Sequence, residues 1–121
     1  MSETVVVLGA SPKPLRYSNK AIRMLRDYGH RVIPVNPAQD EIEGFPVSRH
    51  VSDIREAVDT VTMYVSPAHS AGLLPELLAL KPRRVIFNPG AENPALEAGL
   101  TAAGITVEEA CTLVLLRTNQ F

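Results

Sequence analysis

The chain has 121 residues, of which 45% are hydrophobic and 21% are charged, and its formal net charge is −1. This length and composition are typical of one globular domain whose core needs no disulfide or metal ion for stability. The nearly neutral charge argues against general binding to nucleic acid or to anionic membranes, because both require a basic surface. No apolar run approaches the roughly 18 residues of a membrane-spanning helix, so we expect no membrane partner.

Cysteine usage and the N-terminus bear on the compartment. Cys111 is the only cysteine, so no intrachain disulfide can form, and a reducing environment fits. Residues 1–4 show neither a basic region nor a cleavable apolar stretch. We therefore expect a cytoplasmic protein.

Five apolar segments alternate with helical patterns along the chain. Residues 4–8 form a continuous run rich in β-branched side chains, as expected of a strand buried on both faces. The other predicted strands are residues 31–35, 60–65, 84–88 and 105–108. Pro34 in the second strand lacks an N–H group, which favours a strand end or a sheet edge.

Helical patterns fill most of the segments between these strands. Helices are predicted over residues 18–28, 52–58, 67–80, 93–103 and 111–117, the last of which could instead be a strand. Ser18 or Asn19 would cap the first helix, and Asn93 would cap the fourth. Pro75 lies inside the third helix, where we expect a kink or a restart.

The alternation of apolar strands and helices predicts a parallel sheet covered on both faces. With right-handed crossovers, the result is a doubly wound, Rossmann-like α/β fold with a mainly parallel five-stranded sheet in a single domain over residues 1–121. Ligands of such sheets bind outside the carboxyl ends of the strands. We therefore expect the site in the loops that follow the strands.

The loop after the first predicted strand, residues 9–19, has the context of a phosphate-binding turn. Gly9 permits a tight turn, but Ser11 and Pro14 occupy the places of the second and third glycines of the dinucleotide fingerprint G-x-G-x-x-G. A predicted helix N-terminus follows, which favours anions. The nearby basic side chains are Lys13, Arg16 and Lys20. We interpret this loop as binding phosphate or pyrophosphate.

The other strand-end loops each combine proline with a small polar residue. The second strand is followed by Asn36 and Pro37, where an NAD-binding domain would carry an acid for the ribose hydroxyls. Asn36 could also simply cap a turn. The remaining two loops contribute Val65, Ser66, Pro67, Asn88 and Gly90, with Ser66 as a helix cap and Gly90 as a positive-φ residue. Together these loops outline one rigid, polar cleft.

Five segments form an ordered pattern across nearly the whole chain: VVVLGASPKPLRYSNKA, GHRVIPVNP, YVSP, RVIFNPGAENP and ACTLVLL. In this order they resemble the small stand-alone CoA-binding domain proteins. Those proteins are similar to the N-terminal, Rossmann-like domain of the succinyl-CoA synthetase alpha subunit. The second domain of that subunit, with its phosphorylated histidine, has no counterpart in this sequence. The resemblance therefore implies binding of CoA or an acyl-CoA without ligase chemistry.

The resemblance also implies a role for each loop. The pyrophosphate would lie on the first loop, the adenosine beside the second, and the pantetheine arm between the third and fourth. The implied CoA-binding residues are Gly9, Ala10, Ser11, Pro12, Lys13, Arg16, Ser18, Asn36, Pro37, Val65, Ser66, Pro67, Asn88 and Gly90.

Candidate catalytic groups are few and scattered, so we assign no catalytic residue and no metal site. His69 follows a strand-end loop, and Glu92 is either a general base or a favourable charge near a helix N-terminus. Cys111 is either a buried small side chain or, if a helix begins there, a reactive thiol that could form a mixed disulfide with CoA.

The sequence thus predicts a non-catalytic CoA carrier, sensor or regulatory module. A protein partner or a homodimer is compatible with its exposed sheet edges. Three alternatives stay open: an NAD(P)-binding redox or regulatory module, a small enzyme acting on an acyl-CoA or a nucleotide, and a subunit of a larger assembly whose cleft has lost its ligand.

Overall fold

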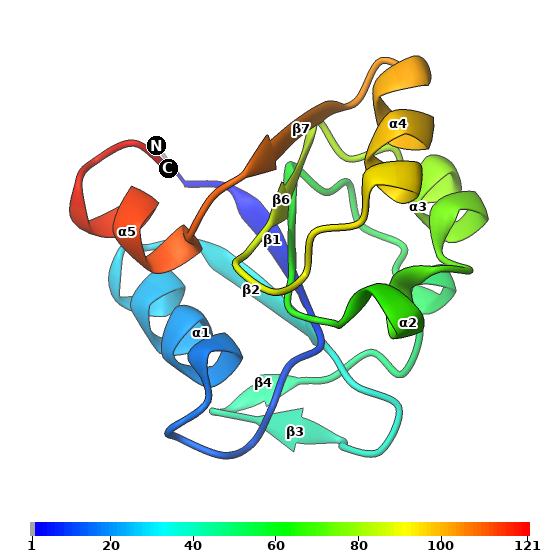
Figure 1. The fold of residues 1–121 in the computed structure, drawn as a ribbon. Helices are drawn as coiled ribbons and strands as arrows, with labels where there is room; N and C mark the ends of the chain where they lie inside the picture. The colour runs from blue at the N-terminus through cyan, green and yellow to red at the C-terminus, as the bar shows by residue number, and fades with distance from the viewer. Residues whose placement is uncertain (1) are drawn as a thin grey trace.

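The computed structural model describes residues 2–121 and contains a five-stranded parallel sheet flanked by helices (Figure 1). In spatial order the strands are β2 (Arg31–Val35), β1 (Thr4–Leu8), β5 (Thr60–Met63), β6 (Arg84–Phe87) and β7 (Thr106–Glu109). All four neighbouring pairs are parallel. Strand β2, which follows β1 in sequence, pairs with one edge of β1, and β5 pairs with the opposite edge. The predicted doubly wound, Rossmann-like fold is confirmed, and its switch point lies between β1 and β5.

The helices form a layer on each face of the sheet. On one face lie α1 (Tyr17–Asp27) and α5 (Thr112–Arg117); on the other lie α3 (Leu74–Leu80) and α4 (Pro94–Ala102) (Figure 1). The smaller elements are β3 (Glu41–Ile42), β4 (Phe45–Pro46), the 3₁₀ turn η1 (Val51–Asp53) and α2 (Pro67–Ser70). Strands β3 and β4 form a separate antiparallel hairpin near the carboxyl end of β2.

Two apolar cores follow from the alternation of side chains along β1. Val5 and Val7 pack with α1 and α5, whereas Val6 and Leu8 pack with α3 and α4. All four are buried. A central parallel strand has no solvent face, which explains why its sequence is an uninterrupted apolar run.

The sequence predicted several boundaries correctly and for the expected reason. Pro34 lies on edge strand β2, where its carbonyl accepts a hydrogen bond from the Ser48 N–H at 3.0 Å. The helix predicted over residues 67–80 restarts, and Pro75 lies in the first turn of α3, where no N–H is needed. The Asn93 side chain caps α4 by accepting from the Leu96 N–H. Residues 112–117 form a helix.

Other boundaries were wrong. Helix α1 begins at Tyr17, and Ser18 and Asn19 lie buried inside its first turn. Asn19 does not cap the helix because its side-chain amide donates to the Ser11 carbonyl at 2.9 Å. The helix predicted over residues 52–58 is only the short turn η1, after which the chain becomes extended at Ile54. Three strands also differ by one or two residues from their predicted ends.

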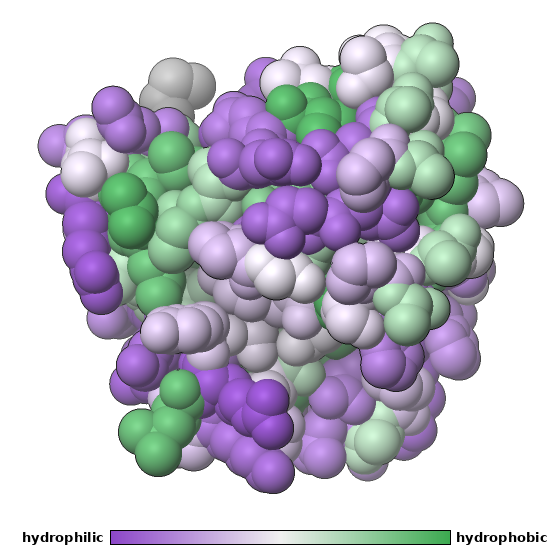
Figure 2. All heavy atoms as spheres, in the orientation of Figure 1, coloured by the Kyte–Doolittle hydropathy of each residue, from purple (hydrophilic) through white to green (hydrophobic). Residues whose placement is uncertain are grey.

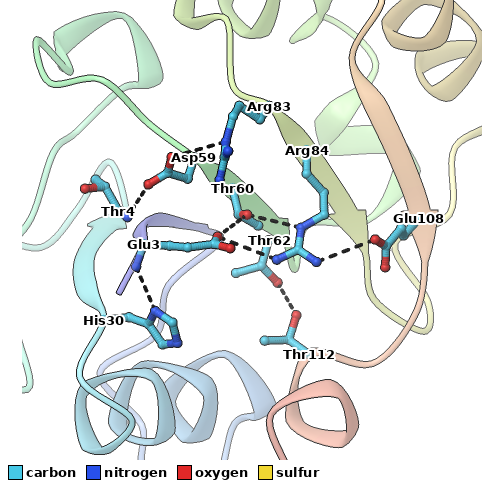
Figure 3. Close-up of polar contacts among 10 residues, drawn as sticks. All are labelled: Glu3, Thr4, His30, Asp59, Thr60, Thr62, Arg83, Arg84, Glu108 and Thr112. Atoms are coloured by element: carbon cyan, nitrogen blue, oxygen red, sulfur yellow. Dashed lines mark hydrogen bonds and ion pairs between the residues drawn. The ribbon is translucent and has the colours of Figure 1, made fainter. Parts of the chain in front are cut away.

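A connected polar cluster closes the amino ends of the strands (Figure 3). The Arg84 guanidinium lies 3.6 Å from the Glu3 carboxylate and 3.5 Å from that of Glu108. Thr60 donates its hydroxyl to Glu3 at 2.6 Å and accepts from Arg84 at 3.2 Å. These contacts join the segment before β1 to β5, β6 and β7.

Candidate functional site

Two neighbouring clefts open at the carboxyl ends of the strands. The first has a volume of about 590 Å³ and lies over the ends of β1, β2 and β5. The second has a volume of about 320 Å³ and lies between α1, α5 and the loop after β6. Tyr64, which directly follows β5, lines both clefts. This is the switch point of the sheet, where a doubly wound fold binds its ligands.

The first cleft gathers six of the residues predicted from sequence. They are Gly9, Ala10, Asn36, Pro37, Val65 and Ser66. Apolar side chains supply much of its wall: Leu8, Val35, Val51, Val65 and Leu73. A cleft with apolar walls and a few polar groups suits a flat, partly apolar ligand such as a nucleobase.

Gly9 holds the first and third loops in close contact. Its φ is +89°, and a Cβ atom built at this position would lie 2.8 Å from the Val65 Cγ1 atom and 3.0 Å from the Tyr64 carbonyl carbon. Both the Gly9 and Ala10 N–H groups donate to the Val35 carbonyl, at 3.3 and 3.1 Å. These two amides are therefore engaged within the protein.

The N-terminus of α1 is more open than the amides of Gly9 and Ala10. No side chain in residues 2–121 caps it, and Arg16 occupies the N-cap position. Its first N–H groups and the positive end of the helix dipole therefore suit a phosphate. The free N–H groups beside the first loop are therefore those at the start of α1 rather than those of Gly9 and Ala10.

Asn36 joins the first and second loops. Its amide donates to the Ala10 carbonyl at 2.8 Å, and its Oδ1 atom accepts from the Ala38 N–H at 2.7 Å. The turn-capping interpretation of Asn36 is therefore confirmed. An NAD-binding domain would have an acidic residue at the end of this strand. Here the position is occupied by Asn36, whose amide nitrogen and oxygen are both hydrogen-bonded within the protein.

The first cleft also contains basic and acidic residues that sequence reasoning did not assign to it. These are Arg49, His50 and Glu76; His69, weighed only as a candidate, lies there too. Arg49 donates to the Pro37 carbonyl at 2.9 Å and pairs with Asp40 at 2.6 Å. The Ser66 hydroxyl lies 2.8 Å from His69 Nδ1.

A lone backbone bridge explains why Arg49 and His50 were missed. It joins Val35 of β2 to Ser48, which brings an irregular segment back beside the sheet. Hydrophobic periodicity in the sequence does not predict that an irregular segment will lie beside the sheet. The proximity of these two residues to the end of β2 was the only signal that could have found them.

The second cleft has a basic rim and a thiol. Its lining residues are Tyr17, Lys20, Tyr64, Asn88, Pro89, Cys111, Leu113 and Arg117. Cys111 is half-buried and occupies the N-cap position of α5. The helix predicted over residues 111–117 is observed and begins one residue later, at Thr112.

Asn88 fixes the start of α5 rather than presenting its amide to the cleft. Its Nδ2 atom donates to the Thr62 hydroxyl at 2.7 Å and to the Met63 carbonyl at 2.9 Å. Its Oδ1 atom accepts from the Thr112 N–H at 2.9 Å, and the hydroxyls of Thr62 and Thr112 lie 2.8 Å apart (Figure 3). This buried network positions the neighbouring Cys111 at the cleft.

The Tyr64 hydroxyl is buried beside the hydroxyls of Thr62 and Thr112, without a hydrogen bond of normal geometry to the residues that the structure describes. Burial, with a smaller contribution from Cys111, raises the pKa of Tyr64 well above its usual value, and the interactions with Thr112 and Thr62 partly offset this rise. The hydroxyl therefore stays protonated and is a hydrogen-bond donor.

Seven predicted residues lie outside the linings of both clefts. They are Ser11, Pro12, Lys13, Arg16, Ser18, Pro67 and Gly90. The Ser11 hydroxyl accepts from the Lys13 N–H at 3.1 Å and so serves the loop itself. Gly90 has the predicted positive φ, and its N–H donates to Glu92 at 2.8 Å, so that carboxylate supports a turn.

Among residues 2–121, no group of three or more histidine, cysteine, aspartate or glutamate side chains is placed to hold a metal ion. None of the helices in the same range is long and apolar enough to cross a membrane.

Comparison with known proteins agrees with this architecture. A solved structure of an uncharacterised protein is 39% identical, with a TM-score of 0.95, and the match covers 100% of this chain and 99% of that one. The uncharacterised protein YneT of Bacillus subtilis (strain 168) is 30% identical over 77 residues, which are 64% of this chain and 57% of YneT.

An ADP-forming acetate–CoA ligase of Archaeoglobus fulgidus, ligase I, is 38% identical over 63 residues, which are 52% of this chain and 9% of the ligase. The matches thus span about half of YneT and a small part of the ligase. A family model described as a CoA binding domain matches residues 3–117. Since this match covers nearly the whole chain, the protein belongs to the CoA-binding domain family.

Proposed function

We propose that the protein binds CoA or an acyl-CoA across both clefts, with the nucleotide in the first and the pantetheine arm in the second. The observation that carries this proposal is the pair of clefts that meet at Tyr64, beside the uncapped N-terminus of α1. Family membership supports the ligand class. The residues present fit such a ligand, because they offer an apolar cleft, an anion site and a cleft for a narrow arm.

The first cleft favours CoA over NAD. Asn36 replaces the acid that would bind ribose hydroxyls, and both its polar groups are engaged. Arg49, His50 and His69 supply basic groups for the 3′-phosphate that distinguishes CoA from its dephospho form. In the tautomer in which the Ser66 hydroxyl donates to Nδ1 of His69, Nε2 carries the ring proton and can donate to a phosphate oxygen.

The diphosphate would lie between the clefts. The N-terminus of α1 provides free N–H groups, and Lys20 continues the basic surface into the second cleft. Lys13 and Arg16 are exposed on the loop that leads into this helix. The amides of Gly9 and Ala10 would shape this path without binding the phosphates, because both donate to Val35.

We propose a carrier, sensor or regulatory role in the reducing cytoplasm rather than acyl-transfer catalysis. The Ser66–His69 contact is the observation that favours an enzyme. It is, however, a local contact across the first turn of α2, and among residues 2–121 no carboxylate hydrogen-bonds His69 to orient its ring. Turnover of an acyl-CoA by the purified protein would contradict this part of the proposal.

A thermal-shift titration with CoA, acetyl-CoA, dephospho-CoA, NAD, NADP and AMP tests the ligand. A ligand at 100 times its dissociation constant stabilises the native state by about 2.7 kcal/mol. For a domain of this size the melting temperature should then rise by roughly 10 °C. We expect this rise with CoA and a smaller one with dephospho-CoA at the same concentration. A rise with NAD or NADP alone, or with none of the ligands, would overturn the proposal.

A matched pair of variants locates the 3′-phosphate. His69→Gln removes the imidazole from the first cleft and should reduce the preference for CoA over dephospho-CoA. His50→Gln removes the second imidazole of the same cleft and should reduce the preference as well. If both variants keep the wild-type preference, the 3′-phosphate lies elsewhere.

A further inference from the structure

The wall of the second cleft is positively charged. Two of its lining residues are basic: Lys20 comes from α1, and Arg117 comes from the last turn of α5. Among residues 2–121, no aspartate or glutamate lines this cleft, and neither of these two side chains takes part in an ion pair. The cleft therefore presents two cations that the described part of the chain does not neutralise.

The first cleft differs in this respect. Its guanidinium, that of Arg49, pairs with Asp40 at 2.6 Å, and the Glu76 carboxylate lines the same cleft. The excess of positive charge thus lies in the second cleft, where the proposed ligand places its pantetheine arm. That arm carries amides, a hydroxyl and a thiol, so it offers the two cations no ionic partner.

The two cations are held on different walls of the second cleft. The Lys20 ammonium lies 5.3 Å from the centre of the Tyr17 ring, a contact that holds the side chain and leaves its hydrogens available to an anion. Arg117 follows Leu113 by four residues on α5, so the two side chains share one side of that helix, and both line the cleft. An anion in the cleft would therefore lie between α1 and α5.

The surroundings of these cations are largely apolar. Tyr17, Pro89 and Leu113 line the cleft, and hydrophobic residues gather over α5 in Figure 2. An apolar surface strengthens the attraction between a cation and an anion that lies beside it. A guanidinium can also bind a carboxylate through two parallel hydrogen bonds. The cleft therefore suits a carboxylate at the end of a short apolar chain.

We propose that the second cleft selects acyl-CoA molecules whose short acyl group ends in a carboxylate, with Arg117 as the main anchor and Lys20 as the second cation. This inference rests on the proposed function, because the pantetheine arm must carry the acyl group into this cleft. Free CoA and acyl-CoA molecules with a terminal methyl group would leave both cations without an anion. Selection is by binding alone, and no covalent bond forms or breaks.

Isothermal titration calorimetry with matched ligands tests the selection. Succinyl-CoA and butyryl-CoA have acyl chains of the same length that end in a carboxylate or a methyl group, and malonyl-CoA and propionyl-CoA form a shorter pair. We expect the wild type to bind the carboxylate member of at least one pair about tenfold more tightly, as for hydrogen bonds to a charged group. Salt should reduce this preference. Equal affinities within both pairs, or tighter binding of the methyl members, would overturn the proposal.

Arg117→Met tests the anchor, because Lys20 also borders the proposed path of the diphosphate. This variant should bind the two members of each pair with nearly equal affinity. The matched control is Arg26→Met, which removes the same charge from an exposed position in the last turn of α1, outside the linings of both clefts. It should keep the wild-type preference. A preference that survives in Arg117→Met, or that Arg26→Met also abolishes, would overturn the assignment to the cleft.

The two proposals fail in different ways. Binding of CoA and of the methyl-terminated acyl-CoA molecules without any preference would overturn the selection and leave CoA binding standing. Binding of none of these ligands would overturn the proposed function and this inference with it.

Discussion

The two ends of the parallel sheet are built in opposite ways. At the amino ends of the strands, Arg84 pairs with Glu3 and Glu108, and its guanidinium stacks 4.6 Å from the centre of the Phe121 ring (Figure 3 shows the ion pairs). At the carboxyl ends, the loops leave two clefts that meet at Tyr64.

This difference suggests that residues at the amino end of the sheet mainly determine stability, whereas residues at the carboxyl end mainly determine ligand binding. Charges at the amino end are matched by neighbouring charges, so changes there should alter the free energy of unfolding and leave ligand binding intact. The clefts lie at the carboxyl end, so changes there should alter the proposed ligand binding and, in one case, improve stability. Gly9, which follows β1 at the carboxyl end, should affect both stability and binding, because it packs against residues 64 and 65.

Gly9→Ala should have the largest effect. The new Cβ atom would lie 2.8 Å from Val65 in a backbone with φ of +89°, so we expect a loss of about 3 kcal/mol in unfolding free energy and a loss of CoA binding. Gly29→Ala is the matched control, because Gly29 has φ of +87° and nothing within 4 Å of the added atom. It should cost about 1 kcal/mol. Equal losses in urea titrations would show that close packing at Gly9 is unimportant.

Arg84→Ala should have the next largest effect, confined to stability. The Arg84 side chain is 15% exposed, so its removal leaves the Glu3 carboxylate half-buried and without its cation. We expect a loss of about 2 kcal/mol, below the value for a fully buried pair because Glu108 is partly exposed.

Arg83→Ala is the control for that variant. Its side chain is 74% exposed and pairs with Asp59 at 3.3 Å, so the expected loss is about 0.5 kcal/mol. Both variants should keep the wild-type thermal shift with CoA. A reduced shift in Arg84→Ala would mean that the amino end of the sheet also controls the clefts.

Tyr64→Phe should change stability and binding in opposite directions. Removal of an unsatisfied buried hydroxyl should raise the unfolding free energy by about 1 kcal/mol. The CoA-dependent thermal shift should become smaller, because the ligand loses its donor. A variant that is less stable than wild type would show that the hydroxyl has a partner in the free protein.

Local signals were sufficient to predict much of this molecule. The apolar run in β1, Pro34 at the edge strand, the restart at Pro75 and the positive φ of Gly90 each follow from the chemistry of one residue or a short pattern. Because the carboxyl ends of parallel strands meet at one edge, correct strands were also enough to bring most of the predicted loops together.

Long-range contacts account for what sequence reasoning missed. The Asn19 side chain donates a hydrogen bond to the Ser11 carbonyl instead of capping its own helix. The Asn88 side chain hydrogen-bonds residues that are 24 to 26 positions away in the sequence. Asparagine suits a cap, a turn or a buried network equally well in sequence. The choice depends on neighbours that only the folded chain supplies, as does the buried position of the Tyr64 hydroxyl.

The smallest effect is a pH dependence at the amino end. His30 Nδ1 accepts a hydrogen bond from the Glu3 N–H at 3.0 Å, and burial lowers the pKa of His30, which nearby Glu3 only partly offsets. In the unfolded state His30 has its ordinary pKa of roughly 6.5, which is higher than its pKa in the folded protein. As the pH falls below about 6.5, the unfolded state therefore binds a proton more readily than the folded state, and the free energy of unfolding should decrease until the pH passes the lower folded pKa.

His30→Asn isolates this titration, because the asparagine oxygen can accept the same N–H without binding a proton. In urea titrations at pH 7.5 and 5.5, the wild type should lose more stability than this variant. His69→Gln at the carboxyl end should follow the wild-type stability profile and differ in CoA binding. If the His69 variant changed stability with pH and the His30 variant did not, the division of the sheet into a stabilising end and a binding end would be wrong.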